Sequence, residues 1–177
     1  CLAARAFGDA KVNEITAVAV DPATGDVFAA GHVGGTLGLG DGVPPVTQGA
    51  LGRDGFVVRF DGMLRATAID HLQGGSMTVR ALAVDGLGTP FVGGSWDGTL
   101  SINGVTSNTS VGTSGFVAQL RDVIGVTWFY GNRLASVDAI RLDRSGRLVV
   151  AGTFTGALTM TGFTLDPVTS AGASDVF

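Results

Sequence analysis

The sequence predicts an all-β protein, and three features of its composition and pattern lead to that prediction. Glycine accounts for 29 of the 177 residues, more than twice the usual share of about 7%, so many turns are expected. Glu14 is the only glutamate and Lys11 the only lysine, so two good helix formers are nearly absent. The apolar runs are short, bounded by turn residues and without a helical period.

Composition also excludes several classes of protein. Hydrophobic residues make up 45% of the chain and charged residues only 15%, which excludes intrinsic disorder and supplies a sizeable core. The net charge of −4 argues against nonspecific binding to nucleic acid or anionic membranes. The uncharged stretch 98–120 contains Ser, Thr, Asn and Gly throughout, so it predicts no membrane span. The single cysteine, Cys1, excludes an internal disulfide and a zinc cluster. We interpret Cys1 as the first residue of a piece of a longer chain, and an acylated lipoprotein N-terminus is the alternative.

An internal repeat of about 60 residues organises the chain. A segment that ends in aspartate occurs three times, at spacings of 64 and 58 residues. Its copies are Ile15–Asp21, Val79–Asp85 and Val137–Asp143. After each copy comes a turn rich in Gly, Pro or Ser, and then an apolar run that ends in glycine, at 27–31, 91–94 and 148–152. Four residues later, every copy has another glycine: Gly35, Gly98 and Gly156.

Two further runs complete each unit. One covers 55–60 and returns at 115–120 and 175–177. A less regular one covers 64–72 and 123–130, with a counterpart at 2–8. We therefore expect four strands per unit, in a chain that starts inside one unit and stops inside another. The predicted boundaries are 1–14 for the end of a preceding unit, 15–75 and 76–132 for two units, and 133–177 for an incomplete unit.

Four antiparallel strands per repeat indicate β-propeller blades, and residues 1–177 would form an incomplete propeller. A sandwich would alternate apolar and polar residues, whereas 17–20 and 81–84 are apolar at every position and need cover on both faces. A β-solenoid buries such runs too, but its rungs repeat at roughly 20 to 30 residues, and no such sub-period is visible. Sandwich and solenoid are the alternatives.

Face-to-face stacking of blades has two consequences. Equivalent residues should share the same burial, both on the first strand and on the third. These are Val18, Leu82 and Ile140, and then Phe56 and Phe116. Known propellers have at least about four blades, so three units should form an open arc. We expect its edge strands to pair with missing blades or with another copy of the chain.

The repeat resembles the bacterial β-propeller repeat family called SBBP. The resemblance rests on a strand ending in Asp, a turn with Gly, a strand ending in Gly, and later Gly-Phe-Val-Ala-Gln-Leu at 115–120. It covers nearly the whole chain. This chain departs from the family pattern at Arg59, Gln119 and Ser145. The resemblance implies a repeat scaffold in large bacterial proteins, secreted or attached to the cell surface, with no family-wide catalytic residues to transfer.

Trp96 and Asp97 form the candidate ligand contact, in the loop between the second strand and the glycine at 98. Trp96 shares its repeat position with Val33 and Phe154, which favours a packing role. Asp97 has no counterpart in the other copies, so a Trp-Asp pair on this loop is the only ligand contact that the sequence singles out.

The other polar patterns favour structural roles. Three aspartates follow the first strand of each copy: Asp21, Asp85 and Asp143. Aspartate heads turns because its carboxylate accepts backbone N–H groups two residues on, and a calcium ring is the alternative. His32 and His71 lie at non-equivalent positions without an evident nucleophile. The glycines within 34–40 lack the helix and lysine of a phosphate loop, and the arginines within 141–147 suit a solvated loop.

The sequence therefore predicts a non-enzymatic scaffold that binds protein or glycan through its loops. No catalytic residue, metal or cofactor is assigned. The alternative is part of a propeller enzyme, a hydrolase or lyase whose catalytic groups lie largely outside these residues. Ionisable side chains gathered from several blades at the central axis would favour the enzyme, and small apolar ones the scaffold.

Overall fold

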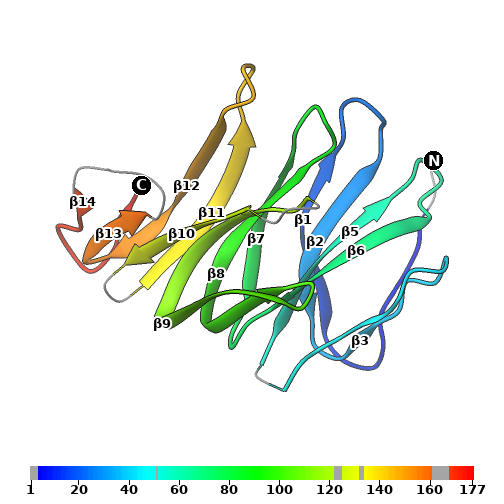
Figure 1. Cartoon of the computed structure of the whole chain (residues 1–177), viewed down its shortest axis with the longest axis horizontal. Helices are drawn as coiled ribbons and strands as arrows, with labels where there is room; N and C mark the ends of the chain where they lie inside the picture. Colours follow the sequence, from blue (N-terminus) through cyan, green and yellow to red (C-terminus); the bar gives the residue numbers. More distant parts are fainter. Residues whose placement is uncertain (1–3, 51, 122–124, 132–133, 161–167) are drawn as a thin grey trace.

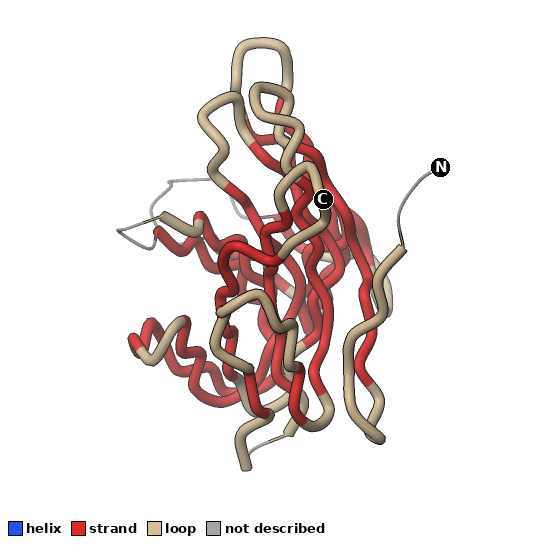
Figure 2. The backbone as a smooth tube through the Cα atoms, turned by 90° about the vertical axis from the view of Figure 1, so that its right-hand side faces the viewer, coloured by secondary structure: helices blue, strands red, loops and turns tan. Residues whose placement is uncertain are grey.

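The computed structural model describes residues 4–50, 52–121, 125–131, 134–160 and 168–177, and this part of the chain contains strands and no helix. The all-β prediction is confirmed. Figure 1 shows the strands as a fan that follows the sequence, from the blue and cyan strands through the green ones to the yellow and red ones. The tube in Figure 2 shows that loops connect the strands mainly at the ends of the fan. The described segments include no helix with the length and apolarity needed to cross a membrane.

The first set of strands is an antiparallel sheet of four. Its order is β1 (Asn13–Val20), β2 (Val27–Val33), β5 (Asp54–Phe60) and β6 (Ala66–Gln73). Two short strands, β3 (Thr36–Leu37) and β4 (Val46–Thr47), pair with each other in a separate hairpin between β2 and β5.

The second and third sets repeat this plan. The second contains β7 (Thr78–Val84), β8 (Pro90–Ile102), β9 (Val105–Gln119) and β10 (Gly125–Gly131). The third contains β11 (Leu134–Leu142), β12 (Leu148–Thr155) and β15 (Asp175–Val176). Its hairpin is formed by β13 (Ala157–Met160) and β14 (Val168–Thr169).

Neighbouring sets are joined in the same way each time. The end of β6 pairs with the part of β8 that enters the hairpin of the second set, through Leu72 and Ile102. In the same manner β10 pairs with β13 in the hairpin of the third set. A parallel pairing of Leu134 in β11 with Thr113 in β9 connects the rest of the third set. Together these pairings join the described strands, apart from β3 and β4, into a 13-stranded network that does not close on itself.

Two of the three hydrophobic core clusters lie between the sets, and the third packs the first set against its own hairpin loop. Between the first and second sets, Phe28 and Val57 pack with Leu82 and Val92. Between the second and third sets, Ala81 and Val117 pack with Ile140 and Phe154. Gly93 lies so close to the third set that a Cβ atom there would be 2.6 Å from Ile140 Cδ1. Small residues on the inner strands therefore let one sheet face approach the next.

A β-bulge recurs at the same place on the first strand of every set. The register slips between Ile15 and Ala17, between Val79 and Ala81, and between Val137 and Ala139. The neighbouring strand carries a glycine there each time: Gly31, Gly94 and Gly152. A Cβ atom on these glycines would lie 1.8, 1.8 and 2.0 Å from a backbone carbonyl oxygen of the first strand. The glycine that ends each apolar run is therefore required by the close approach of two backbones.

The predicted equivalence of buried residues is confirmed at four positions and wrong at one. Leu82 is 3% exposed and Ile140 1% exposed, and Phe56 and Phe116 are also buried. Val18, however, is 60% exposed. Ala17 and Ala19 turn towards the second set, so Val18 points to the opposite face of β1, against which the described chain packs no sheet.

Leu82→Ala should lower the free energy of unfolding by about 2 to 5 kcal/mol, because it opens a cavity between two sheets. Val18→Ala is the matched control at the equivalent repeat position, and its effect should stay within about 0.5 kcal/mol because the side chain is exposed. Urea melts of the two variants and the parent chain measure both. Equal losses of unfolding free energy in Leu82→Ala and Val18→Ala would contradict the exposed position assigned to Val18.

The exposed face of β1 should make the chain associate. Val18 and Val20 are 60% and 56% exposed on the same face of this edge strand, and such edges favour pairing with other chains. We expect the mass measured by light scattering to rise with concentration and Val18→Lys to suppress that rise. Leu87→Lys, a change at an 82% exposed turn residue, should not. Association that is the same in both variants would contradict this assignment.

Candidate functional site

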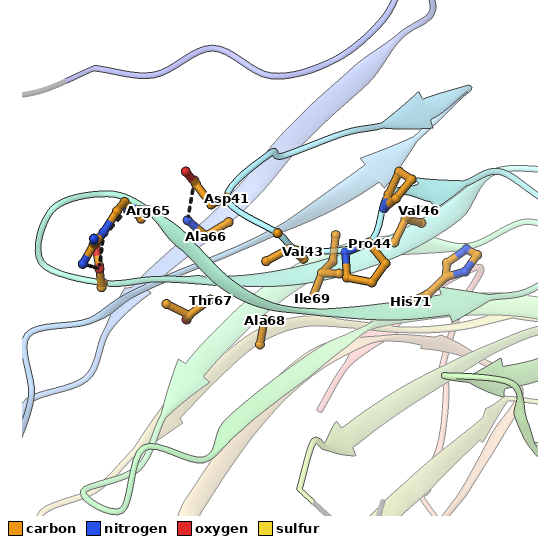
Figure 3. A pocket seen from close by; sticks show the side chains of 13 residues that line it. Asp41, Val43, Pro44, Val46, Arg65, Ala66, Thr67, Ala68, Ile69 and His71 are labelled. Carbon is orange, nitrogen blue, oxygen red and sulfur yellow. Dashed lines mark hydrogen bonds and ion pairs between the residues drawn. The ribbon is translucent and has the colours of Figure 1, made fainter.

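A groove of about 890 Å³ lies between β6 and the loop that joins β3 to β4. Figure 3 shows Val43 and Pro44 on the loop side and the residues from Arg65 to His71 along the strand side. Val43 and Ile69 also contact the core beneath. The middle of the groove is therefore aliphatic, and its two ends are polar.

Length distinguishes this loop from its counterpart in the second set. There the hairpin turns through Asn103 and Gly104, whose φ angles of 51° and 79° are those of a two-residue type I′ turn. In the first set the loop instead runs from residue 38 to residue 45, and positive φ angles at Gly40, Asp41 and Gly42 bend it back towards β6. The same framework thus carries a tight turn in one unit and a groove wall in another.

Asp41 fixes one end of the groove. Its carboxylate forms an ion pair with Arg5 and accepts the backbone N–H of Ala66 at 3.0 Å. Arg5 also donates to the carbonyl oxygen of Leu64 at 2.8 Å. The hydrogen bond from Arg5, followed by that from Ala66, lowers the pKa of Asp41 below its usual value. An ionised Asp41 therefore ties the loop to the start of β6 and to the segment before β1.

A buried aspartate fixes the other end. Asp54 is 2% exposed, and its Oδ2 accepts hydrogen bonds from Gly49 N and His71 Nε2, each at 2.8 Å. His71 is partly exposed and lines the groove. The segment between β4 and β5 and the end of β6 are therefore both held by one carboxylate.

The outer edge of β6 carries backbone groups that another strand could use. Asn103 occupies part of this edge, because its Oδ1 accepts His71 N at 2.8 Å and its N–H donates to His71 O at 2.9 Å. In an antiparallel strand, alternate residues direct both backbone groups to the same side. The N–H and C=O of Ile69 therefore point to the same outer edge, beside the groove.

The structure places the residues singled out in the sequence as follows. Trp96 is fully buried and packs edge-on against Phe116, with ring centroids 6.0 Å apart. Val33 and Phe154, at the equivalent positions, are buried as well, so the predicted packing role of Trp96 is confirmed. Asp97 is half-buried, and its backbone carbonyl accepts Gly75 N at 2.9 Å. Ligand contact by this loop stays a prediction. Because Trp96 is fully buried, the side chain of Asp97 would make that contact.

The turn role of the three aspartates is confirmed. Asp21 accepts Ala23 N, Asp85 accepts Leu87 N and Asp143 accepts Ser145 N, at 2.8, 2.9 and 2.8 Å. Hydrogen bonds from Ser145 and Arg147 lower the pKa of Asp143 to about 2. Among the residues that the structure describes, no group of three or more His, Cys, Asp or Glu side chains is arranged to hold a metal ion. The histidines lie apart, His71 at the groove and His32 in the core.

Sequence reasoning missed the groove because its wall is a loop whose path depends on the contact of Asp41 with Arg5, which is distant in the chain. One signal was present: residues 38–45 interrupt the repeat and contain Pro44 and Pro45 beside three glycines. A scan against models of known protein families and a search of curated proteins both return no match.

Asp54→Ala should lower the free energy of unfolding by about 1 to 3 kcal/mol, because it leaves the partly buried N–H of Gly49 without its acceptor and removes a buried partner of His71. Amide hydrogen exchange at Gly49 should also become faster. Arg65→Ala is the control, since it removes only an exposed ion pair with Asp61 and should change stability by less than about 1 kcal/mol. Unchanged exchange at Gly49 in Asp54→Ala would contradict the role given to this carboxylate.

Proposed function

We propose that the chain is a non-enzymatic β-propeller repeat scaffold that binds a protein partner in the groove beside β6. The single observation that carries the proposal is the outward backbone edge at Ile69, which pairs with no other strand among the described residues and lies next to an aliphatic groove. An extended peptide can add to such an edge through main-chain hydrogen bonds, while its alternate side chains enter the groove.

The propeller part of the proposal is supported by repetition. Three sets of strands share one order, one bulge position and one link to the next set. Two of the core clusters lie between the sets, as blades stacked around an axis would require. The resemblance to SBBP repeats adds a location, in a large bacterial protein that is secreted or held at the cell surface.

A protein partner fits the groove better than a glycan. A sugar presents hydroxyl groups that need hydrogen-bond partners, whereas the middle of the groove is aliphatic. Val43, Pro44 and Ile69 offer aliphatic contacts instead, and Arg65 at one end is already paired with Asp61. A segment with alternating aliphatic residues would complement the groove.

One observation favours the competing hypothesis of a propeller enzyme. Polar and ionisable side chains from three sets do gather at one end of the inner strands: Thr16, Arg80 and Asp138. We expected such a gathering for an enzyme and small apolar residues for a scaffold. The carboxylate of Asp138 accepts hydrogen bonds from the hydroxyls of Ser136 and Thr153. These bonds fix its orientation, which suits ligand binding as well as catalysis.

Selection from a displayed library of random peptides about ten residues long tests the proposal. Peptides that bind the chain should lose most of their affinity for Ile69→Pro, which removes the outward N–H. They should bind Ile69→Thr more weakly than the parent but measurably, because Ile69→Thr keeps that donor. Far-UV circular dichroism and urea melts check that both variants fold. Binders that do not distinguish Ile69→Pro from the parent, or a glycan array that yields the only Ile69-dependent ligands, would refute it.

A further inference from the structure

A second polar site lies where the inner strands β1, β7 and β11 come together. It is a pocket of about 590 Å³, a size within the range of small-molecule sites. Its lining includes Glu14 and Thr16 from β1, Arg80 from β7 and Asp138 from β11. His32 from β2 and Arg53, the residue before β5, also line it, beside Thr78 and Val79 of β7. We call this site the axial pocket.

Three of these residues occupy the bulges. Thr16, Arg80 and Asp138 are the extra residues at the register slips of β1, β7 and β11. A bulge redirects the side chain of its extra residue, and bulges are common beside functional sites. The equivalent bulge position of each set therefore lies at the same pocket. Its side chain is a hydroxyl in the first set, a cation in the second and an anion in the third.

His32 provides a buried donor without a partner. Its Nε2 accepts the backbone N–H of Val79 at 2.7 Å, so the neutral ring carries its proton on Nδ1. The side chain is 5% exposed, and Nδ1 has no hydrogen-bond partner among the residues that the structure describes. Glu14 Oε2 lies 3.7 Å away, which is beyond hydrogen-bond distance. A buried donor of this kind is satisfied when a ligand supplies an acceptor.

The ring is neutral at pH 7. Burial, assisted by the charge of Arg53, holds the pKa of His32 below its usual value of 6.5. Glu14 opposes this shift, and Arg80 contributes to it. Both arginines line the same pocket as the ring, so all three can contact one ligand.

The two arginines differ in what they already contact. Arg80 Nε lies 3.5 Å from Asp138 Oδ1, and that carboxylate also accepts hydrogen bonds from the hydroxyls of Ser136 and Thr153, at 2.9 and 3.3 Å. Arg53 is exposed and forms no ion pair with any described residue. Asp138 is thus largely satisfied within the protein, and Arg53 is available to a ligand.

We propose that the axial pocket binds a uronic acid, a sugar that bears one carboxylate. Arg53 and the Nδ1–H of His32 would hold the carboxylate, since a planar guanidinium fits a carboxylate with two parallel hydrogen bonds. Glu14, whose side chain is 57% exposed at the rim, would accept hydrogen bonds from the sugar hydroxyls. The two acidic residues of the pocket repel a doubly charged phosphate more strongly than a singly charged carboxylate.

Calorimetric titration of the whole chain with glucuronate and galacturonate tests this proposal. Glucose, glycine and inorganic phosphate serve as comparison ligands, because they lack the carboxylate, the sugar ring or both. We expect saturable binding of at least one uronate and at least about tenfold weaker binding of every comparison ligand, the loss typical of a charge-assisted hydrogen bond. Glycine or phosphate binding as tightly as the uronates would overturn the ligand assignment, and so would the absence of saturable uronate binding.

Two matched variants locate the site. Arg53→Gln, at an exposed position, should keep the fold and weaken uronate binding by about tenfold or more. Arg144→Gln is the control, because it removes the same charge from an exposed turn far along the chain. Equal affinity in Arg53→Gln and the parent would overturn the proposal. In a bound sample, the Nδ1–H of His32 and the N–H of Val79 should shift in NMR spectra, and unshifted signals at saturation would also overturn it. Ile69→Pro should not change uronate binding, because Ile69 does not line the axial pocket. A failure of the uronate proposal can therefore be distinguished from a failure of the groove proposal.

Discussion

The close contact between a glycine and a backbone carbonyl at the start of each set is the constraint on which the rest of the structure depends. At Gly31, Gly94 and Gly152 the position of an added Cβ lies 1.8 to 2.0 Å from a carbonyl oxygen of the first strand, so no side chain fits without moving a strand. The first strand bulges at that point. The bulge and the glycine together determine how closely the first two strands of a set approach each other. The apolar side chains of the inner strand then pack against the neighbouring sheet.

Stacking of the sheets follows from that inner-strand geometry. A two-faced apolar strand is stable only when both faces are covered, and β7 satisfies this with Leu82 towards the first set and Ala81 towards the third. β1 has a covered face at Ala17 and an uncovered one at Val18. The same sequence pattern therefore gives a core strand in one unit and an exposed apolar face in another, because burial depends on what a strand packs against as well as on its own residues.

The repeat made much of the fold predictable. Apolar runs, turn aspartates and glycines recur in register, so strand order, the turns at Asp21, Asp85 and Asp143, and the buried positions of Leu82, Ile140 and Phe116 could be inferred. The pairing of β6 with β8, the groove and the axial pocket could not. They depend on contacts between segments distant in the chain, such as His32 with Val79 and Arg5 with Asp41, which no local pattern encodes. The exposure of Val18 was mispredicted because equivalence was assumed where neighbours differ.

Positions that differ between structurally equivalent sets are the ones free to carry function. Two such classes occur here. The hairpin loop is a two-residue turn at Asn103 and Gly104 but an eight-residue wall at 38–45, and the bulge residue is Thr16, Arg80 or Asp138. The bulge residues belong to none of the core clusters, and in the loop only Leu39 and Val43 contribute to one. The other positions can therefore change without loss of core packing. The hairpin loop forms a wall of the groove, and the bulge residues line the axial pocket. The glycines that recur in all three sets fix the strands that carry both.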